Sequence, residues 1–317
     1  MAQKNDKRDM ELSMELTSEL QGTCAGDYNY VNLLRLDVSL PVSSSISFDV
    51  ASLSTFMTAD ESIGDGLQMF SNLDAGNIPF ALSVLGFNWQ INNMHSLFLG
   101  IRNMNEDYFC SNGTSFFTNS SCGIYPTISA NYPIANYPIA SIGVHYCYDA
   151  NPFKVQVSLY NGTGYNRFFG RDNVFRICPK SDGVFAIAEV SYTRGGSCYF
   201  LGNALYCKAG GIGTTPWFYT EQCITSNLTL LAGCSHTFTA DAECKDFIGL
   251  GAICKIGRCQ LGAFTDYADF MERNEFATEL TCKIPILQYF DIQPTVHLIT
   301  YDGRLQCAAA LRMALYI

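Results

Sequence analysis

The chain has 317 residues and a formal net charge of −10, and it contains no polybasic stretch, which argues against a nucleic-acid-binding protein. Hydrophobic residues make up 48% of the chain and charged residues only 15%, whereas about 25% is usual in soluble proteins. Because no run of 18 apolar residues is present, composition leaves two classes of protein, a secreted β-rich domain and a membrane β-barrel.

The N-terminal segment, residues 1–7, is predicted to be a short extension before a single barrel domain at 8–317. The opening letters MAQKNDKRD lack the hydrophobic core of a signal peptide. The first two residues resemble the tail of a small-residue cleavage site. We therefore expect the first part of the precursor to be missing from this chain.

Period-two alternation of apolar and polar residues recurs along the chain and predicts β-strands. Residues 10–16 read MELSMEL and residues 33–40 read LLRLDVSL, each with one apolar and one polar face. The same alternation returns in KVQVSLY at 154–160 and ATELTCKI at 277–284. The sixteen predicted strands are 8–17, 31–40, 46–56, 80–90, 95–104, 139–148, 153–160, 184–193, 198–206, 213–223, 228–238, 247–255, 258–268, 275–284, 290–300 and 305–317.

Short and long connections alternate between these strands through most of the chain. The short connections are turn-like, as in INNM, RGGS and ITSN. The longer ones are predicted at 18–30, 57–79, 105–138 and 161–183, followed by shorter loops at 207–212, 239–246, 269–274 and 301–304. Outer-membrane barrels have short periplasmic turns and long outside loops. The predicted fold class is therefore all-β: a closed antiparallel transmembrane β-barrel of about sixteen strands.

In a lipid-embedded barrel the apolar face of each strand points outward and the polar face lines the lumen. Arg there supplies hydrogen-bond donors, and Glu and Asp supply acceptors. Each such residue has an alternative role, as part of an ion pair that only stabilises the wall. The candidate pore-lining residues on the strands are Arg35, Asp37, Arg102, Glu189, Glu279, His297 and Arg312. Asn105, Glu106 and Asp107, at the start of the longest predicted loop, are candidates if that loop folds into the pore.

The longest predicted loop, 105–138, ends in a tandem repeat of NYPIA at 131–135 and 136–140. Proline cannot donate to a β-ladder, and the residue before it prefers extended geometry. Two interpretations stay open. The repeat is a stiff, extended approach to the next strand, or the loop folds inward and narrows the pore, so that its polar residues meet the solute.

The 14 cysteines do not have the spacing of a compact disulfide framework. Several occupy strand positions that suit a small apolar residue, and buried Cys behaves as one. If a disulfide forms, Cys110 and Cys122 in the longest loop are the expected pair. With no CxxC motif and four well-separated His residues, we expect no metal site and no cofactor.

The segment LFLGIRNMNEDYF at 97–109 resembles the glycine–basic–Asn–acidic–aromatic segment of carbohydrate-selective porins of the OprB type. MFSNLDAGN (69–77), the loop at 116–146 and the closing segment 277–299 follow in the order of that family. The resemblance places Arg102 at the family's basic position and Asn105 at its Asn. The C-terminal Ile317 departs from the aromatic residue with which such barrels usually end.

The resemblance implies an outer-membrane porin of a Gram-negative bacterium that passes sugars or other small hydrophilic solutes by passive diffusion and performs no chemistry. The implied partners are those solutes together with outer-membrane lipid and lipopolysaccharide, with no nucleic acid, and monomer and homo-oligomer both stay open.

The sequence leaves two alternatives to a porin. The first is a barrel with an enzyme site, which the four separated His residues and the absence of a GxSxG motif disfavour. The second is a secreted, disulfide-containing β-rich adhesin or glycan-binding protein. The cysteine count permits it, as do the sequons at Asn112, Asn119, Asn161 and Asn227.

Overall fold

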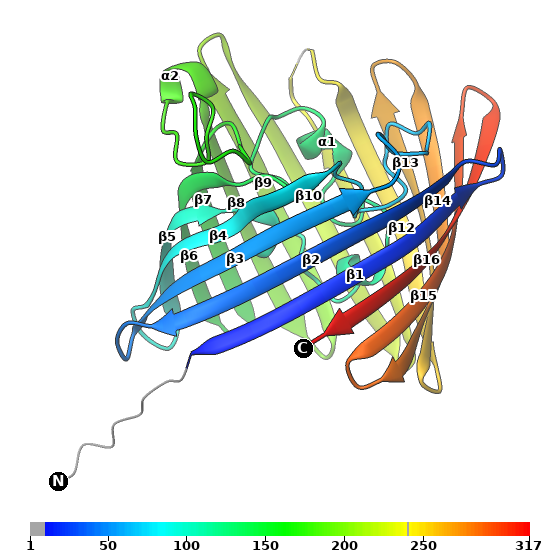
Figure 1. Ribbon diagram of the computed structural model, residues 1–317, viewed down its shortest axis with the longest axis horizontal. Coiled ribbons are helices and arrows are strands. Elements are labelled where there is room, and N and C mark those ends of the chain that lie inside the picture. Colours follow the sequence, from blue (N-terminus) through cyan, green and yellow to red (C-terminus); the bar gives the residue numbers. More distant parts are fainter. Residues whose placement is uncertain (1–9, 240) are drawn as a thin grey trace.

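The computed structural model describes residues 10–239 and 241–317, so the predicted extension 1–7 lies outside the described residues. Within them, sixteen antiparallel strands close into a barrel in which each strand pairs with its sequence neighbours and β1 pairs with β16 (Figure 1). The strands are β1 Glu11–Thr23, β2 Tyr28–Pro41, β3 Ile46–Met57, β4 Ile78–Gln90, β5 His95–Arg102, β6 Ser141–Ala150, β7 Phe153–Asn161, β8 Val184–Arg194, β9 Ser197–Lys208, β10 Gly211–Thr225, β11 Leu228–His236, β12 Cys244–Ile256, β13 Cys259–Phe270, β14 Asn274–Leu287, β15 Phe290–Tyr301 and β16 Arg304–Tyr316. The predicted fold class is confirmed.

In the described part of the chain, helix is confined to four short segments in the connections. They are the 3-10 turns η1 Met104–Glu106 and η2 Thr114–Phe116 and the one-turn helices α1 Pro126–Ser129 and α2 Pro179–Asp182. Among the residues that the structure describes, no helix has the length and apolar character needed to cross a membrane.

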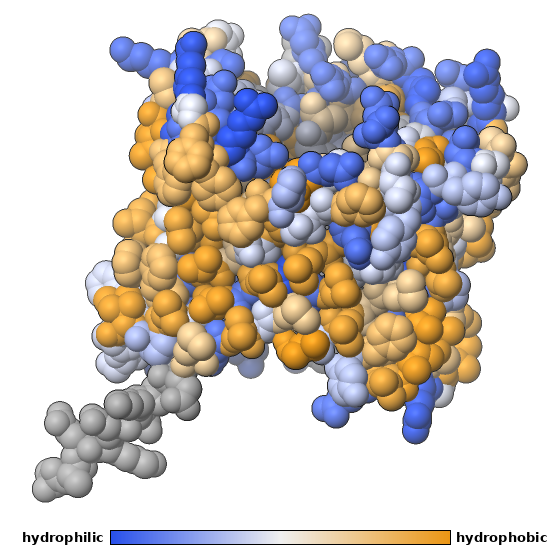
Figure 2. Space-filling view, in the orientation of Figure 1, coloured by the Kyte–Doolittle hydropathy of each residue, from blue (hydrophilic) through white to orange (hydrophobic). Residues whose placement is uncertain are grey.

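The two faces of the wall differ in polarity, as strand β10 illustrates. Trp217 and Tyr219 point inward and are buried, whereas Phe218 between them points outward and is exposed. The same alternation leaves Leu201, Leu250 and many other large apolar side chains exposed on the outer wall. Figure 2 shows the result on the face in view, a broad hydrophobic area across the wall with hydrophilic groups gathered at the rim that carries the long loops. This is the polarity of a barrel that faces lipid.

The predicted long connection at 18–30 is wrong. Strand β1 continues to Thr23, and only residues 24–27 join it to β2. The sequence indicates this continuation, because Glu19 and Gln21 occupy the inward polar positions of the alternation. Both side chains are buried. Long connections at this rim are limited to 58–77, 103–140 and 162–183, whereas the β9–β10 and β15–β16 connections are two-residue turns.

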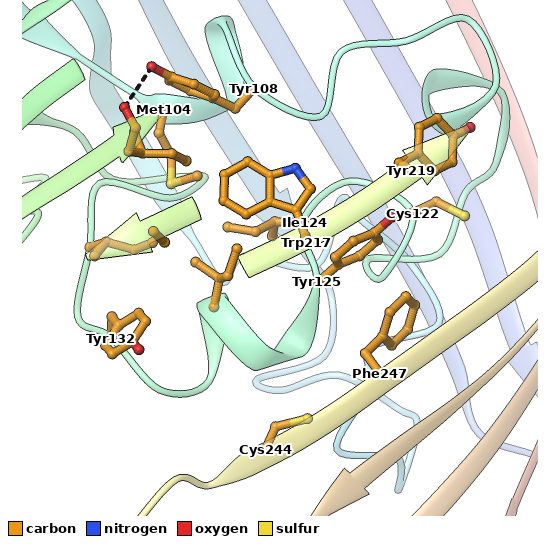
Figure 3. Close-up of a cluster of buried hydrophobic side chains, with 14 of the residues drawn as sticks. Met104, Tyr108, Cys122, Ile124, Tyr125, Tyr132, Trp217, Tyr219, Cys244 and Phe247 are labelled. Carbon is orange, nitrogen blue, oxygen red and sulfur yellow. Dashed lines mark hydrogen bonds between the residues drawn. The ribbon is translucent and has the colours of Figure 1, made fainter. Parts of the chain in front are cut away.

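The main hydrophobic cluster lies inside the barrel rather than between layers of secondary structure. Side chains of the 103–140 connection pack against inward-facing residues of strands β7 to β13. Tyr125 stacks on Phe247 with ring centroids 4.6 Å apart (Figure 3). The Phe109 ring centroid lies 5.1 Å from that of Trp217. Sixteen strands enclose more space than their own side chains can fill. The loop supplies the missing volume.

Gly202 of β9 makes room for one of these inward aromatic side chains. It lies directly opposite Trp217 in the β9–β10 ladder, and the indole covers the place where a Cβ on Gly202 would sit. A side chain at Gly202 would therefore push Trp217 into the cluster.

We predict that Gly202→Val destabilises the barrel by about 1–3 kcal/mol, the usual range for overpacking a core. The measurement is unfolding in detergent micelles, followed by heat-modifiable migration or tryptophan fluorescence. Gly211→Ala is the matched control, because no atom lies within 4 Å of its added Cβ. Equal stability of the two variants would contradict this account of Gly202.

Candidate functional site

The site begins with a buried carboxylate that holds the 103–140 connection inside the barrel. Glu279 of β14 is 2% exposed and accepts the backbone N–H groups of Thr118 at 2.9 Å and Asn119 at 2.9 Å. It also accepts the Thr118 hydroxyl at 3.0 Å and the Asn119 side-chain amide at 2.6 Å. A carboxylate is suited to this role, because ionised acceptors form the stronger hydrogen bonds.

Two further glutamates act in the same way at other positions. Glu275 accepts the backbone N–H groups of Leu67 at 2.6 Å and Gln68 at 3.2 Å, and so ties the 58–77 connection to β14. Glu221 of β10 accepts the N–H of Gly113 at 2.8 Å. Backbone groups of both connections thus find partners in the wall, as buried polar groups must.

A cavity of about 340 Å³ remains between β1, β2 and β3 and the start of the 103–140 connection. Arg35 lines it and pairs with Asp37 at 2.6 Å and with Glu106 at 2.8 Å. Both Arg35 contacts are double, with the guanidinium donating to two carboxylate oxygens of each partner. The remaining lining includes Glu11, Ser13, Ser39, Asp49, Val84 and Arg102.

A second ion pair fixes the connection where it leaves the wall. Arg102 at the end of β5 donates to Asp107 through Nε at 2.6 Å and Nη2 at 2.7 Å. His145 Nε2 lies 3.4 Å from the same carboxylate. Two consecutive acidic residues of the connection thus hold two arginines of the wall: Glu106 pairs with Arg35, and Asp107 pairs with Arg102.

The ionisation of Glu106 follows from its surroundings. Burial on its own would raise the pKa of this carboxyl, but the hydrogen bonds and charge of Arg35, assisted by Ser83 and Arg102, lower the pKa below 4.5. Glu106 therefore carries its negative charge at neutral pH.

A second cavity of about 340 Å³ adjoins the first, since Glu15 in its lining lies opposite Arg35 in the β1–β2 ladder. Its main cation, Arg312 of β16, donates to Glu19 at 2.7 Å and to Asn72 at 2.8 Å. Its lining combines charged and polar residues with aromatic ones, including Asn105, Phe109, Tyr137, Lys283, Asp291, Gln293 and Tyr316.

The structure brings together most, but not all, of the predicted pore-lining residues. Arg35, Asp37, Arg102 and Glu106 line the first cavity, and Asn105 and Arg312 line the second. Asp107 lies beside them, with its carboxylate taken up by Arg102.

Three predicted residues lie elsewhere and line neither of the two 340 Å³ cavities. Glu189, Glu279 and His297 are 4%, 2% and 3% exposed, respectively. Glu189 accepts the side-chain amide of Gln156, and His297 lies 3.2 Å from the Thr118 hydroxyl. Their inward position follows from the alternation, but the 103–140 connection covers them.

Sequence reasoning missed several polar residues of the second cavity as candidates. Lys283, which pairs with Asp291 at 3.1 Å, is on the inward face of the alternating segment 277–284 and could have been found from it. Asn72 could not, because it reaches Arg312 from a connection with no periodic pattern.

The two copies of NYPIA hold the connection at different places. Asn131 in the first copy donates to the carbonyl of Cys244 on the far wall at 2.7 Å. Tyr137 in the second copy donates to the carbonyl of Leu73 at 3.2 Å and borders the second cavity. The repeat is therefore more than a stiff, extended approach to the next strand, because it contacts the wall and the neighbouring connection.

The expected Cys110–Cys122 disulfide is absent, because both thiols are free. Cys110 donates to the carbonyls of Asn105 and Tyr108, whereas Cys122 is buried beside Asn119. Within residues 10–239 and 241–317, no group of three or more His, Cys, Asp or Glu side chains is arranged to hold a metal ion.

Comparison with known proteins agrees with this architecture. No model of a protein family matches the chain, and no curated protein does. Among solved structures, OprB of Pseudomonas putida at high pH is 13% identical, with a TM-score of 0.82 over 97% of this chain and 94% of that one. This is a porin fold. The resemblance to the OprB type seen in the sequence is confirmed at the level of the fold.

Other porins match over similar lengths. A loop-deletion mutant of OmpT from Vibrio cholerae is 14% identical, with a TM-score of 0.64 over 98% of this chain and 99% of that one. A mutant of the Rh. blastica porin is 10% identical, with a TM-score of 0.62 over 98% of this chain and 100% of that one. At such identities the likeness establishes the fold alone.

We predict that Glu279→Ala loosens the 103–140 connection without unfolding the barrel. Each backbone N–H left unsatisfied costs about 1–3 kcal/mol, while the β-ladder of β14 stays intact. The measurement is limited proteolysis in detergent, with cleavage mapped by mass spectrometry. Glu272→Ala, at an exposed turn residue, is the control. Identical cleavage of both variants would mean that Glu279 does not hold the connection.

A pH prediction follows from Glu106. A carboxyl with a lower pKa in the folded chain than in the unfolded chain stabilises the fold above the unfolded pKa, and this stabilisation is lost as pH falls through the folded pKa. Proteolysis of the connection should therefore stay constant from about pH 8 to about pH 5 and increase only below 4.5. The Glu106→Gln variant should be cleaved faster than the wild type already at neutral pH. The measurement uses an acid-tolerant protease and a pH-insensitive reference substrate. An increase in wild-type cleavage near pH 6–7 would contradict the assignment.

Proposed function

We propose that the protein is an outer-membrane porin of a Gram-negative bacterium through which sugars or other small hydrophilic solutes diffuse passively. The observation that carries the proposal is the pair of adjoining polar cavities inside a barrel whose outer wall is apolar. Selectivity in such a channel comes from width, hydrogen-bonding groups and charge, so no chemical step is involved. The 103–140 connection would form the constriction.

The apolar outer wall supports a membrane location over a secreted adhesin. Side chains such as Leu99, Leu159, Leu201 and Leu250 are each more than half exposed in the isolated chain. Contiguous apolar surface of this kind is unfavourable in water and favourable against acyl chains. An adhesin would have no use for it.

The second cavity supports sugars as the solute. Sugars present rings of hydroxyl groups together with apolar ring faces. The cavity offers aromatic surface from Phe109, Tyr137 and Tyr316 next to the charged side chains of Lys283 and Arg312. This chain shares its fold with OprB of P. putida. OmpT of Vibrio cholerae has been solved in a trimer form. Experiments on this chain have to establish its solute and its oligomeric state.

Solute flux tests the proposal directly. The protein would be refolded in detergent, reconstituted into liposomes, and followed by swelling in mono-, di- and trisaccharides. We expect uptake that falls with solute size and is absent from protein-free liposomes. Liposomes that contain folded protein and do not swell in any of these sugars would overturn the proposal.

We predict that Arg35→Ala shifts the channel toward cations. The substitution removes the cation that neutralises Asp37 and Glu106, so the first cavity becomes more negative. The reversal potential in a tenfold KCl gradient should move toward the cation limit, while Arg194→Ala, at the exposed end of β8, should not move it. An unchanged reversal potential for Arg35→Ala would show that ions do not pass beside Arg35.

A further inference from the structure

The connection between β7 and β8, residues 162–183, folds over the outside of the barrel (Figure 1). The backbone of Tyr165 pairs with Ala140, and the Phe168 ring lies 5.4 Å from that of Phe80. Val174 is buried against Leu82 and Ile101, which belong to the outward face of β4 and β5. This loop therefore covers part of the wall that faces lipid, whereas the other two long connections enter the barrel.

The free side of the same loop is apolar. Phe169 is 89% exposed, Ile177 66% and Phe175 48%. By contrast, of the phenylalanines in the other long connections, Phe70, Phe116 and Phe117 are at most 5% exposed and Phe109 is partly buried. Large apolar side chains clustered on an exposed loop indicate a surface that contacts something other than water.

The loop is also the most basic part of a strongly acidic chain. Arg167, Arg171, Arg176 and Lys180 lie within fourteen residues, with Asp172 as the only acidic residue among them, although the chain as a whole has a net charge of −10. Such a concentration of positive charge attracts anionic groups.

One of these cations is used internally and makes the loop compact. Arg176 donates to Asp182 through Nε at 2.8 Å and to the Arg171 carbonyl at 3.0 Å. Burial alone would raise the pKa of Asp182, but the bonds from Arg176, Ser181 and Asn161 lower the pKa to about 2, so the pair stays ionised. The N–H of Val174 donates to the Arg167 carbonyl at 2.8 Å.

The other cations are available to a partner. Arg167, Arg171 and Lys180 are exposed, and in the part of the chain that the structure describes no carboxylate lies within 4.0 Å of their charged groups. Basic groups and large apolar groups thus alternate along one loop, as in RFFGR at 167–171.

We propose that the loop 162–183 binds the phosphate-bearing head group of an outer-leaflet lipid, with Arg167 and Arg171 on the phosphate and Phe169, Phe175 and Ile177 among the acyl chains. This rests on the proposed function, because it needs the barrel to lie in the outer membrane with its long connections outward. The Arg fork matches phosphate oxygens, and aromatic side chains suit the boundary between head groups and acyl chains. A second copy of the chain is the other occupant to test.

The experiment is native mass spectrometry of the full chain in detergent, titrated with diphosphorylated lipid A, with the same lipid lacking phosphate, and with inorganic phosphate. We expect lipid A to bind selectively. The double variant Arg167→Ala/Arg171→Ala should bind it about tenfold more weakly, since each basic residue near an anionic lipid contributes to the affinity. The control Arg194→Ala/Arg258→Ala removes two exposed arginines at the opposite rim, one at the end of β8 and one in the β12–β13 turn, and should bind like the wild type.

Three outcomes would overturn the inference: equal lipid binding by both double variants, equal binding of the phosphate-free lipid, or binding of inorganic phosphate as tight as that of the lipid. A dimer or trimer that Phe169→Ala dissociates would assign the surface to a second copy instead. Conductance of the same preparations separates this inference from the proposed function. A chain that conducts but binds lipid A without Arg dependence contradicts only the lipid site. A chain that binds lipid A through these arginines but never conducts contradicts only the porin.

Discussion

Buried carboxylates of the wall determine how the interior of this barrel is built. A sixteen-stranded barrel encloses a lumen too wide for its own side chains to fill, so two connections enter it. Their backbone N–H groups leave water on the way in and would be costly if unpaired. Glu279, Glu275 and Glu221 accept them from three positions on the wall. Most of the other features of the site depend on where these anchors lie.

The anchors explain why the open space is off-centre. Inward-facing aromatic residues of β7 to β13 pack with the 103–140 connection and fill that side of the lumen. Opposite them, the strands near the β1–β16 seam carry charged residues inward, and the space stays open beside Arg35 and Arg312. Ion pairs to Glu106 and Glu19 hold these arginines at the edge of the space instead of across it. A solute would therefore pass between a charged wall and the edge of the folded connection.

Strand positions and their two faces could be predicted from the sequence, because alternation is a local property that closure of the barrel preserves. The inward positions of Arg35, Asp37 and Arg312 follow from it. What covers an inward residue is not local. Glu189, Glu279 and His297 have the same pattern as Arg35 but are buried, and Glu279 and His297 contact Thr118 of a connection more than a hundred residues away in the sequence. The prediction of a loop at 18–30 is wrong for the opposite reason. There the alternation through Glu19 and Gln21 correctly indicates a strand, but the prediction places the start of the turn-like segment that follows too early.

The central claim is that current and solutes pass beside the 103–140 connection. Ser115, an exposed residue of this connection, lines the second cavity. The most direct test is single-channel recording of Ser115→Cys in a Cys110→Ser background, with a small water-soluble cationic methanethiosulfonate added to the bath. The account predicts irreversible stepwise loss of conductance in Ser115→Cys and none in the background chain. Conductance that persists after mass spectrometry has verified complete modification of Cys at this position would place the passage elsewhere and contradict the account.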